Sequence, residues 1–224
     1  VTVRCGWIFK TESIVMPAVL DLMGGGAVLR SWLPLINRCG QSIPPMFLAS
    51  RVRSLRRKKW FALGCTASMS LIFFILSGIW AQTGGNAIWV PVVFLVLYAL
   101  FFSSTGLNHL AINTLQGKLV RVRMRGKLLM GANVLGGFLA LLLAGWLLPR
   151  WLQADSAQFD WIFATSAGFF ALATVFLFCL KESPDTFPRQ QMGLGALLHE
   201  IRRTLREDQH FRGLSAVAFL FGCS

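Results

Sequence analysis

The sequence predicts an all-α protein, a polytopic membrane helix bundle with six transmembrane helices and the start of a seventh. Only 14% of its 224 residues are charged and 55% are hydrophobic, with a mean hydropathy of +0.60. Soluble domains carry about 25% charged residues, so this chain is too apolar to cover a water-facing surface. Its cations are also concentrated between long apolar stretches, with six of the 22 in residues 51–59 and five in residues 118–127.

Six apolar stretches come close to the roughly 20 residues that a helix needs to cross the hydrocarbon core. The first is the most polar, because it contains Lys10, Glu12 and Asp21, and the glycines at 24–26 separate it from the second. A seventh stretch begins near Leu214. In chain order the six are Gly6–Met23, Ala27–Ser50, Trp60–Trp80, Ile88–Leu115, Leu128–Leu148 and Phe159–Leu180.

These stretches divide the chain into three parts. We expect residues 1–180 to form an N-terminal six-helix bundle, residues 181–212 a cytoplasmic central linker, and residues 213–224 the start of the seventh helix. The linker pattern predicts an amphipathic helix that lies on the membrane or against the bundle, and a solvated helix that only connects is the alternative. The pattern consists of apolar residues at helical spacing, namely Leu194, Leu198, Ile201 and Leu205.

The two basic clusters are the loops after the second and fourth spans, whereas Ala81–Ala87 on the other side carries no charge. The positive-inside rule therefore places the N-terminus and the basic loops in the cytoplasm. We expect a multi-pass protein of the plasma (inner) membrane of a bacterium. Topology, and contact with anionic lipid headgroups at roughly 1 kcal/mol per cation, account for the net charge of +13 without nucleic acid. The clusters are Arg51, Arg53, Arg56, Arg57, Lys58 and Lys59, and Lys118, Arg121, Arg123, Arg125 and Lys127.

Four charged residues inside the first two spans are spaced so that they can pair. When the spans are folded back on each other about Gly25, Glu12 lies 13 residues before it and Arg38 lies 13 after it. Asp21 lies four before Gly25 and Arg30 lies five after it. Equal rise per residue places the members of each pair at similar depths. We therefore expect two interhelical ion pairs, Glu12–Arg38 deep in the bilayer and Asp21–Arg30 near the water.

The deeper pair is a candidate for a polar pathway, because charges inside a bilayer usually face a bundle interior or a cavity. Such a pathway would move a proton or bind an ionic substrate, and a static pair that orients two helices is the alternative. Gln41 joins the candidates, because it lies three residues after Arg38 and shares its helix face. Pro44 and Pro45 remove two backbone donors and should bend this span, for gating or for fixed curvature.

The fourth span ends in three further candidates for this pathway, Asn108, His109 and Asn113. His109 and Asn113 are four residues apart and so share a face, which in lipid must point inward. His109 is a possible proton carrier, because histidine titrates near neutrality. A hydrogen-bonded structural histidine is the alternative.

The sequence contains no catalytic or cofactor motif. Its three histidines and five cysteines lack the spacing of a metal site, and no phosphate-binding loop, hydrolase or metalloprotease motif occurs. We therefore expect no enzyme activity, no catalytic residue, no metal and no cofactor. The cysteines are expected to be free thiols, because their scatter implies no disulfide framework.

The loop after the second span resembles a motif of the major facilitator superfamily, whose members usually have G-x-x-x-D-R-x-G-R-[RK] at this place. The matching stretch is Leu48–Trp60, LASRVRSLRRKKW. Its basic half is present at residues 56–59, and Arg51 or Arg53 matches the motif arginine. The acidic residue and both glycines are absent, so the charge relay attributed to the motif lacks its acid here. The six spans and the long linker before a seventh likewise resemble the N-terminal half of such a transporter.

The resemblance implies a secondary active transporter that moves a small solute across the membrane by alternating access. Substrate would bind near the bilayer midplane between two six-helix halves, and in this family helices 1 and 4 line the cavity. It therefore implies roles in the substrate or proton pathway for Glu12, Asn108, His109 and Asn113. It also implies a partner that the chain lacks, a C-terminal helix bundle, so we expect the sequence to be a fragment.

Two other classes of function stay open as alternatives. A membrane-embedded enzyme acting on lipid-linked substrates would need a nucleophile or an acid and a base at an interface. The sequence offers only the sparse set Arg150, Asp155 and Asp160 there. A non-transporting assembly or sensory protein of the membrane would need no such site.

Overall fold

A computed structural model describes residues 2–8, 15–24, 26–85, 87–152 and 159–183, and eight positions between 195 and 213. The ordered elements within these ranges are seven helices and no strands, so the predicted all-α class is confirmed for the described residues. The helices are α1 (Thr2–Ile8), α2 (Val15–Leu22), α3 (Ala27–Ser54), α4 (Lys58–Thr83), α5 (Val90–Leu119), α6 (Val122–Leu152) and α7 (Phe159–Cys179).

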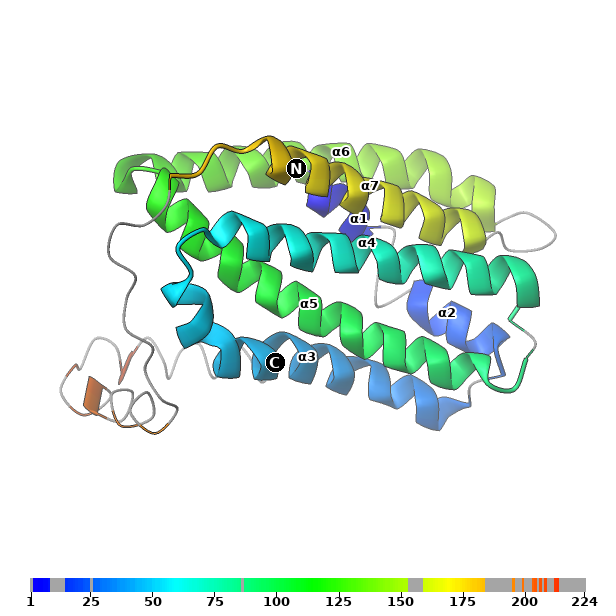
Figure 1. The fold of residues 1–224 in the computed structure, drawn as a ribbon. Helices are drawn as coiled ribbons and strands as arrows, with labels where there is room; N and C mark the ends of the chain where they lie inside the picture. Colours follow the sequence, from blue (N-terminus) through cyan, green and yellow to red (C-terminus); the bar gives the residue numbers. More distant parts are fainter. Residues whose placement is uncertain are drawn as a thin grey trace.

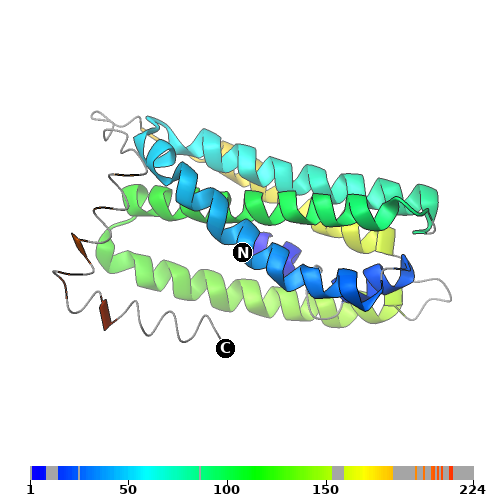
Figure 2. The same cartoon turned by 90° about the horizontal axis from the view of Figure 1, so that it is seen from below.

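The long helices form one bundle in which α3 and α5, and α4 and α7, pack together although they are not consecutive in the sequence. In Figure 1 α3, α5, α4 and α7 lie side by side in that order, and α3 packs on α5, α5 on α4, and α4 on α7. The view from below in Figure 2 shows that α6 runs along the bundle and is separated from α3 and α5 over most of its length. Short α1 packs against both α6 and α7, and α2 packs against α3.

Four of the helices are long and apolar enough to cross a membrane: α4, α5, α7 and residues 122–147 of α6. These correspond to the third to sixth predicted spans. The second predicted span forms the long helix α3 but is less apolar, because Arg30, Arg38 and three prolines lie within it. The first predicted span contains two short helices of 7 and 8 residues, α1 and α2, and residues 9–14 between them lie outside the described residues.

The helix ends follow local backbone chemistry. Three residues, 55–57, join α3 to α4, and Leu55 and Arg57 at the flanking caps have extended backbones. At the other end α4 stops at Gly84, whose left-handed φ of 57° suits a residue without a Cβ and whose N–H donates to the Trp80 carbonyl at 2.8 Å. Pro91 stands at the start of α5, where its missing N–H costs no helical hydrogen bond.

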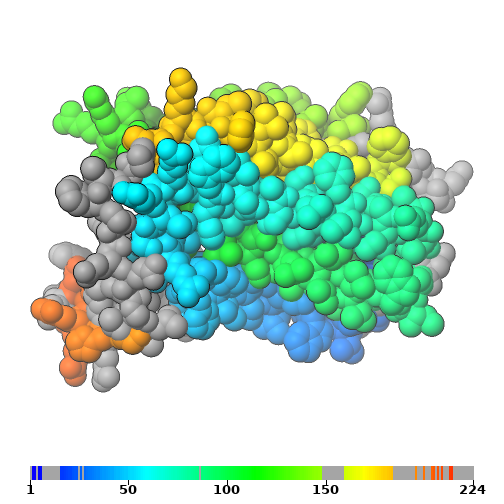
Figure 3. Space-filling view, in the orientation of Figure 1, coloured from blue at the N-terminus to red at the C-terminus, as the bar shows by residue number. Residues whose placement is uncertain are grey.

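Phenylalanine rings fill the centre of the bundle between α4, α5 and α7. Phe73 of α4 is only 2% exposed, and its ring centroid lies 4.9 Å from that of Phe101, 6.0 Å from Phe163 and 5.8 Å from Phe170. Edge-to-face and stacked pairs of this kind add to the energy of burial. Seen space-filling from the side of Figure 1, the side chains of α4 and α5 close over the front of the bundle (Figure 3).

Two glycines bring α3 and α5 into backbone contact. A Cβ on Gly106 would lie 2.6 Å from the Gln41 carbonyl oxygen, and a Cβ on Gly40 would lie 2.7 Å from the Phe102 Cβ. Only residues without side chains allow this approach, as is common at helix crossings in membranes. The crossing lies in α3 between Pro34 and Pro44.

The predicted linker and seventh span fall mostly outside the described residues. Positions 195, 199, 203, 204, 206, 212 and 213 are helical. The four apolar residues of the predicted amphipathic stripe and the predicted span from Leu214 onward lie outside the described residues.

Candidate functional site

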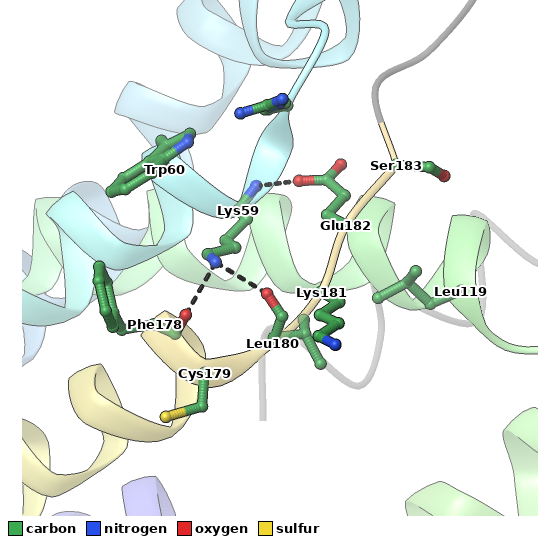
Figure 4. A pocket seen from close by; sticks show the side chains of 10 residues that line it. Lys59, Trp60, Leu119, Phe178, Cys179, Leu180, Lys181, Glu182 and Ser183 are labelled. Atoms are coloured by element: carbon green, nitrogen blue, oxygen red, sulfur yellow. Dashed lines mark hydrogen bonds between the residues drawn. The ribbon is translucent and has the colours of Figure 1, made fainter.

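A buried carboxylate joins three helix ends at the basic end of the bundle. Glu182 lies three residues after α7, and its side chain is 1% exposed. Its two oxygens accept hydrogen bonds from the backbone N–H groups of Lys58 at 3.1 Å and Lys59 at 2.8 Å, and from the Lys118 Nζ at 2.9 Å. Figure 4 shows the bond from Lys59. The ends of α4, α5 and α7 therefore meet at one side chain.

Glu182 acts as the N-terminal cap of α4. The first N–H groups of a helix have no partner within it, and a negative charge there is stabilised by the helix dipole. The residue at the N-cap position, Arg57, makes no side-chain cap hydrogen bond. The capping group comes instead from more than 120 residues along the chain.

Lys59 makes the reciprocal contact at the end of α7. Its Nζ donates to the carbonyl oxygens of Phe178 and Leu180, both at 2.8 Å (Figure 4). A cation is favourable at the C-terminus of a helix, where carbonyl groups lack partners. The start of α4 and the end of α7 thus each supply a charged cap to the other.

The environment of Glu182 keeps it ionised. Burial by itself would raise the pKa of the Glu182 carboxyl, but the hydrogen bonds from Lys118, Lys59 and Lys58 and the charge of Lys118 outweigh it, so its pKa is lowered from the usual 4.5. The Nζ of Lys118 also donates to the Ser183 carbonyl. This cluster is therefore a charged structural contact near neutral pH.

Both predicted basic loops lie at this same end, since Lys58 and Lys59 come from the first and Lys118 from the second. A further cation, Arg125, closes the turn between α5 and α6, where its Nε donates to the Val120 carbonyl at 3.0 Å and its Nη2 to the Gly117 carbonyl at 2.6 Å. The clusters therefore supply internal contacts as well as surface charge.

The structure brings Asp21 and Arg30 together. Their closest oxygen and nitrogen atoms are 3.2 Å apart, and both side chains are about half exposed. The pair joins α2 to α3 across the turn at Gly24, whose φ is 73°. Counting residues outward from the glycines predicts that Asp21 and Arg30 lie opposite each other, and the two residues do meet in the structure.

The deeper predicted pair, Glu12–Arg38, has only Arg38 among the described residues, because Glu12 lies outside them. Arg38 lies on α3 with its side chain exposed. Gln41 is half-buried, and its amide donates to the Asn37 side-chain oxygen one turn earlier. Arg38, Asn37 and Gln41 therefore form a polar segment of α3 at the level where this helix crosses α5.

The three polar candidates of the fourth span separate onto two faces of α5. Asn108 is 4% exposed and packs against α4, where its Oδ1 accepts from the Thr66 hydroxyl at 3.4 Å and its amide approaches the Met69 sulfur at 3.7 Å. His109 and Asn113 are exposed. Consecutive helix residues point about 100° apart, so Asn108 packs between α4 and α5 whereas His109 and Asn113 lie on an exposed part of α5.

Sequence reasoning did not single out Glu182. It was one acid in a linker whose charges nearly balance, and its partners are more than 60 residues away along the chain. The available signal was local, an acid two residues after the last apolar residue of a span and two residues before Pro184. Among the described residues no group of three His, Cys, Asp or Glu side chains could hold a metal ion.

Comparison with family models, with curated proteins and with solved structures finds no match to this chain. The family resemblance therefore rests on the loop motif and on the order of the helices.

Proposed function

We propose that the chain is the N-terminal half of a secondary active transporter of the major facilitator type. In this proposal it supplies six spans, from α1 with α2 to α7, and the cytoplasmic linker. The N-terminus and both basic loops face the cytoplasm of a bacterial inner membrane. It moves a small solute by alternating access and has no enzyme activity. The observation that carries the proposal is the exposure of polar side chains on α3 and α5, namely Arg38, His109 and Asn113.

These side chains would lie within the hydrocarbon core if α3 and α5 span it. At 1.5 Å per residue, Arg38 is roughly 16 Å from the start of α3 and roughly 24 Å from its end. His109 is roughly 15 Å from the basic end of α5. A guanidinium facing lipid at this depth costs at least about 2.5 kcal/mol. The exposed polar face of α3 and α5 is therefore expected to be covered by protein or to line a water-filled pathway.

Two further features favour a partner bundle on this chain. Only 11% of the most apolar window of α6 is buried, so most of its residues have surface available for contact. The glycine crossing of α3 and α5 lies close to Pro34 and Pro44, where helices bend. A C-terminal bundle packed on α3 and α6 would enclose the polar face, and rocking of the two halves would expose it to either side.

Cysteine accessibility tests the pathway directly, because Cys39 is exposed on α3 beside Arg38. The full chain, with Cys39 as its only cysteine, is placed in lipid vesicles and treated with a membrane-impermeant thiosulfonate. Modification of Cys39 is expected, because the pathway brings water to it. The matched control is a Leu71→Cys protein without other cysteines, since Leu71 is 59% exposed on α4 at a similar depth and should face lipid.

Equal rates at the two positions, or no reaction at either, would remove the polar pathway from the proposal. Flux is tested separately with the full-length protein, which includes the C-terminal bundle, in vesicles that contain a pH-sensitive dye, with and without an imposed pH gradient. Candidate solutes are added one class at a time. The expected result is solute-driven proton movement or gradient-driven uptake that Arg38→Gln abolishes.

A further inference from the structure

A surface pocket opens beside the charged caps, where the start of α4 meets the end of α7. Its volume is about 590 Å³, and it is lined by Arg57, Lys59 and Trp60 on one side and by residues 178–183 on the other, with Leu119 also in the lining (Figure 4). Each side contributes both charged and apolar residues, and the aromatic rings of Trp60 and Phe178 form an apolar wall. The pocket therefore lies at the boundary between the apolar surface of the bundle and its basic end.

Two of the three cations in this pocket are not neutralised within the described part of the chain. The Lys59 Nζ is held by the carbonyl groups that end α7, and the charge of Glu182 is matched by Lys118. Arg57 and Lys181 are exposed, and the ion pairs found among the described residues involve neither. The lining of the pocket therefore has an excess of positive charge that is available to a bound ligand.

The apolar wall consists of aromatic rings that face outward. Trp60 is 51% exposed and Phe178 is 59% exposed, with their centroids 6.1 Å apart in an edge-to-face pair. The Lys59 Nζ lies 5.4 Å from both centroids. Exposed aromatics next to cations are typical of the headgroup level of a membrane, where acyl chains and phosphates meet.

We propose that this pocket binds the headgroup of an anionic phospholipid from the cytoplasmic leaflet. Arg57 and Lys181 contact the phosphate, and the first part of an acyl chain lies along Trp60 and Phe178. Charge complementarity selects the phosphate, and the aromatic wall selects a lipid over a soluble anion. Basic pockets at the cytoplasmic ends of membrane helices bind such headgroups. The inference requires that α4 and α7 span the membrane but does not depend on transport.

The test measures the binding of dioleoyl phosphatidylglycerol to the detergent-purified full chain by native mass spectrometry. Arg57→Gln/Lys181→Gln is expected to weaken the affinity about tenfold, because two phosphate contacts are lost. The control, Arg121→Gln/Arg123→Gln, removes the same charge from exposed residues of the other loop, and less than a twofold change is expected. Phosphatidylcholine with the same chains should bind weakly to all three proteins.

A second matched pair tests the apolar wall. Phe178→Ala should weaken phosphatidylglycerol binding severalfold, whereas Phe176→Ala should not, although Phe176 is 60% exposed on the same helix. If Arg57→Gln/Lys181→Gln fails to fold by circular dichroism, Lys181→Gln against Arg123→Gln repeats the charge comparison.

Equal losses in the two charge variants would show diffuse attraction of lipid to the basic end and would overturn the site. No loss in either would overturn it as well. Competition with glycerol 3-phosphate distinguishes a lipid ligand from a soluble phosphate. If it displaces the lipid at equal concentration, the pocket binds a soluble phosphate and the lipid assignment is wrong.

Discussion

The helix α4 and the candidate span of α6 are equally long and almost equally apolar, yet they are packed very differently. Each candidate span has 26 residues, but 44% of the window in α4 is buried against 11% in α6. Lipid tails are as apolar as leucine, so hydropathy gives no driving force for one helix to bind another in a membrane. Within this chain, the difference goes with the kind of side chain on each helix.

The packed helix has side chains that reach specific partners. The Ser70 hydroxyl donates to the Ala167 carbonyl and the Ser77 hydroxyl to the Asp160 carbonyl, both at 2.9 Å on α7. Phe73 is surrounded by rings from α5 and α7. On α6 the buried positions among the described residues are small, Gly136 and Ala140, and this helix packs mainly against the short helix α1 and against α7. Hydrogen bonds and rings, more than apolar content, hold this bundle together.

The largest expected effect is on the aromatic centre. Phe73→Ala leaves a cavity among three rings and should lower the free energy of unfolding by about 3 kcal/mol. Phe138→Ala on α6 is the control, because Phe138 is 60% exposed, and a change below about 0.5 kcal/mol is expected. Unfolding by sodium dodecyl sulfate in mixed micelles measures both. Equal losses would mean that α4 and α6 are packed alike, which would break the comparison.

Glu182→Gln is expected to have the second largest effect on stability. The substitution changes the contact that joins α4 to α5 and α7, and α6 takes no part in that contact. It removes a charge-assisted cap and leaves Lys118 without its ion-pair partner, which should cost about 2 kcal/mol. The same titration in micelles measures it. If the loss is no larger than for an exposed acid such as Asp21, the buried carboxylate adds nothing to stability.

The same side chain predicts a pH dependence with a defined sign. Because the pKa of the Glu182 carboxyl is lowered in the folded protein, its contribution to stability is fully present above its usual value of about 4.5. The contribution is lost as the pH falls below that value, through the pKa of the folded state. Melting temperatures between pH 7 and pH 3 should therefore converge for the wild type and Glu182→Gln, and parallel curves would contradict the assignment.

Gly106→Ala is expected to have a smaller effect. The new methyl group would meet the backbone of Gln41, so α3 and α5 must separate, at a cost of about 1 to 2 kcal/mol. Gly137→Ala on α6 is the matched control, because a Cβ there meets nothing within 4 Å and alanine favours the helix by up to about 1 kcal/mol. Thermal melting of the two variants should move in opposite directions.

Asp21→Asn should have the smallest effect. Its ion pair with Arg30 is half exposed, and exposed pairs contribute about 0 to 1 kcal/mol and weaken in salt. A small loss that disappears at 1 M salt is the expected result. A loss above about 2 kcal/mol that persists in salt would show that the turn between α2 and α3 is more deeply embedded than its exposure indicates.

The sequence was sufficient for features that depend on local composition. Trp60–Trp80 was expected and Lys58–Thr83 is found, and Phe159–Leu180 corresponds to Phe159–Cys179. The Asp21–Arg30 pair needed only a turn and a count of residues. Apolar runs and glycine turns act within a few residues, so a single sequence contains them.

Features that depend on neighbours could not be predicted. Asn108 and His109 are adjacent in sequence, and only the position of α4 decides that one is buried and the other exposed. The cap of α4 comes from Glu182, 123 residues beyond Lys59. Equally apolar α4 and α6 differ in burial because of partners that hydropathy does not describe.

The reciprocal caps between α4 and α7 have a mechanical consequence. Residues 178–182 are held in place by three hydrogen bonds to Glu182 and two from Lys59. Tension applied to the chain beyond Ser183 would therefore load the first turn of α4 and the last turn of α5 before it reached α7. Any partner that pulls on the linker would therefore apply force to α4 and α5 at once, through the few residues that follow α7.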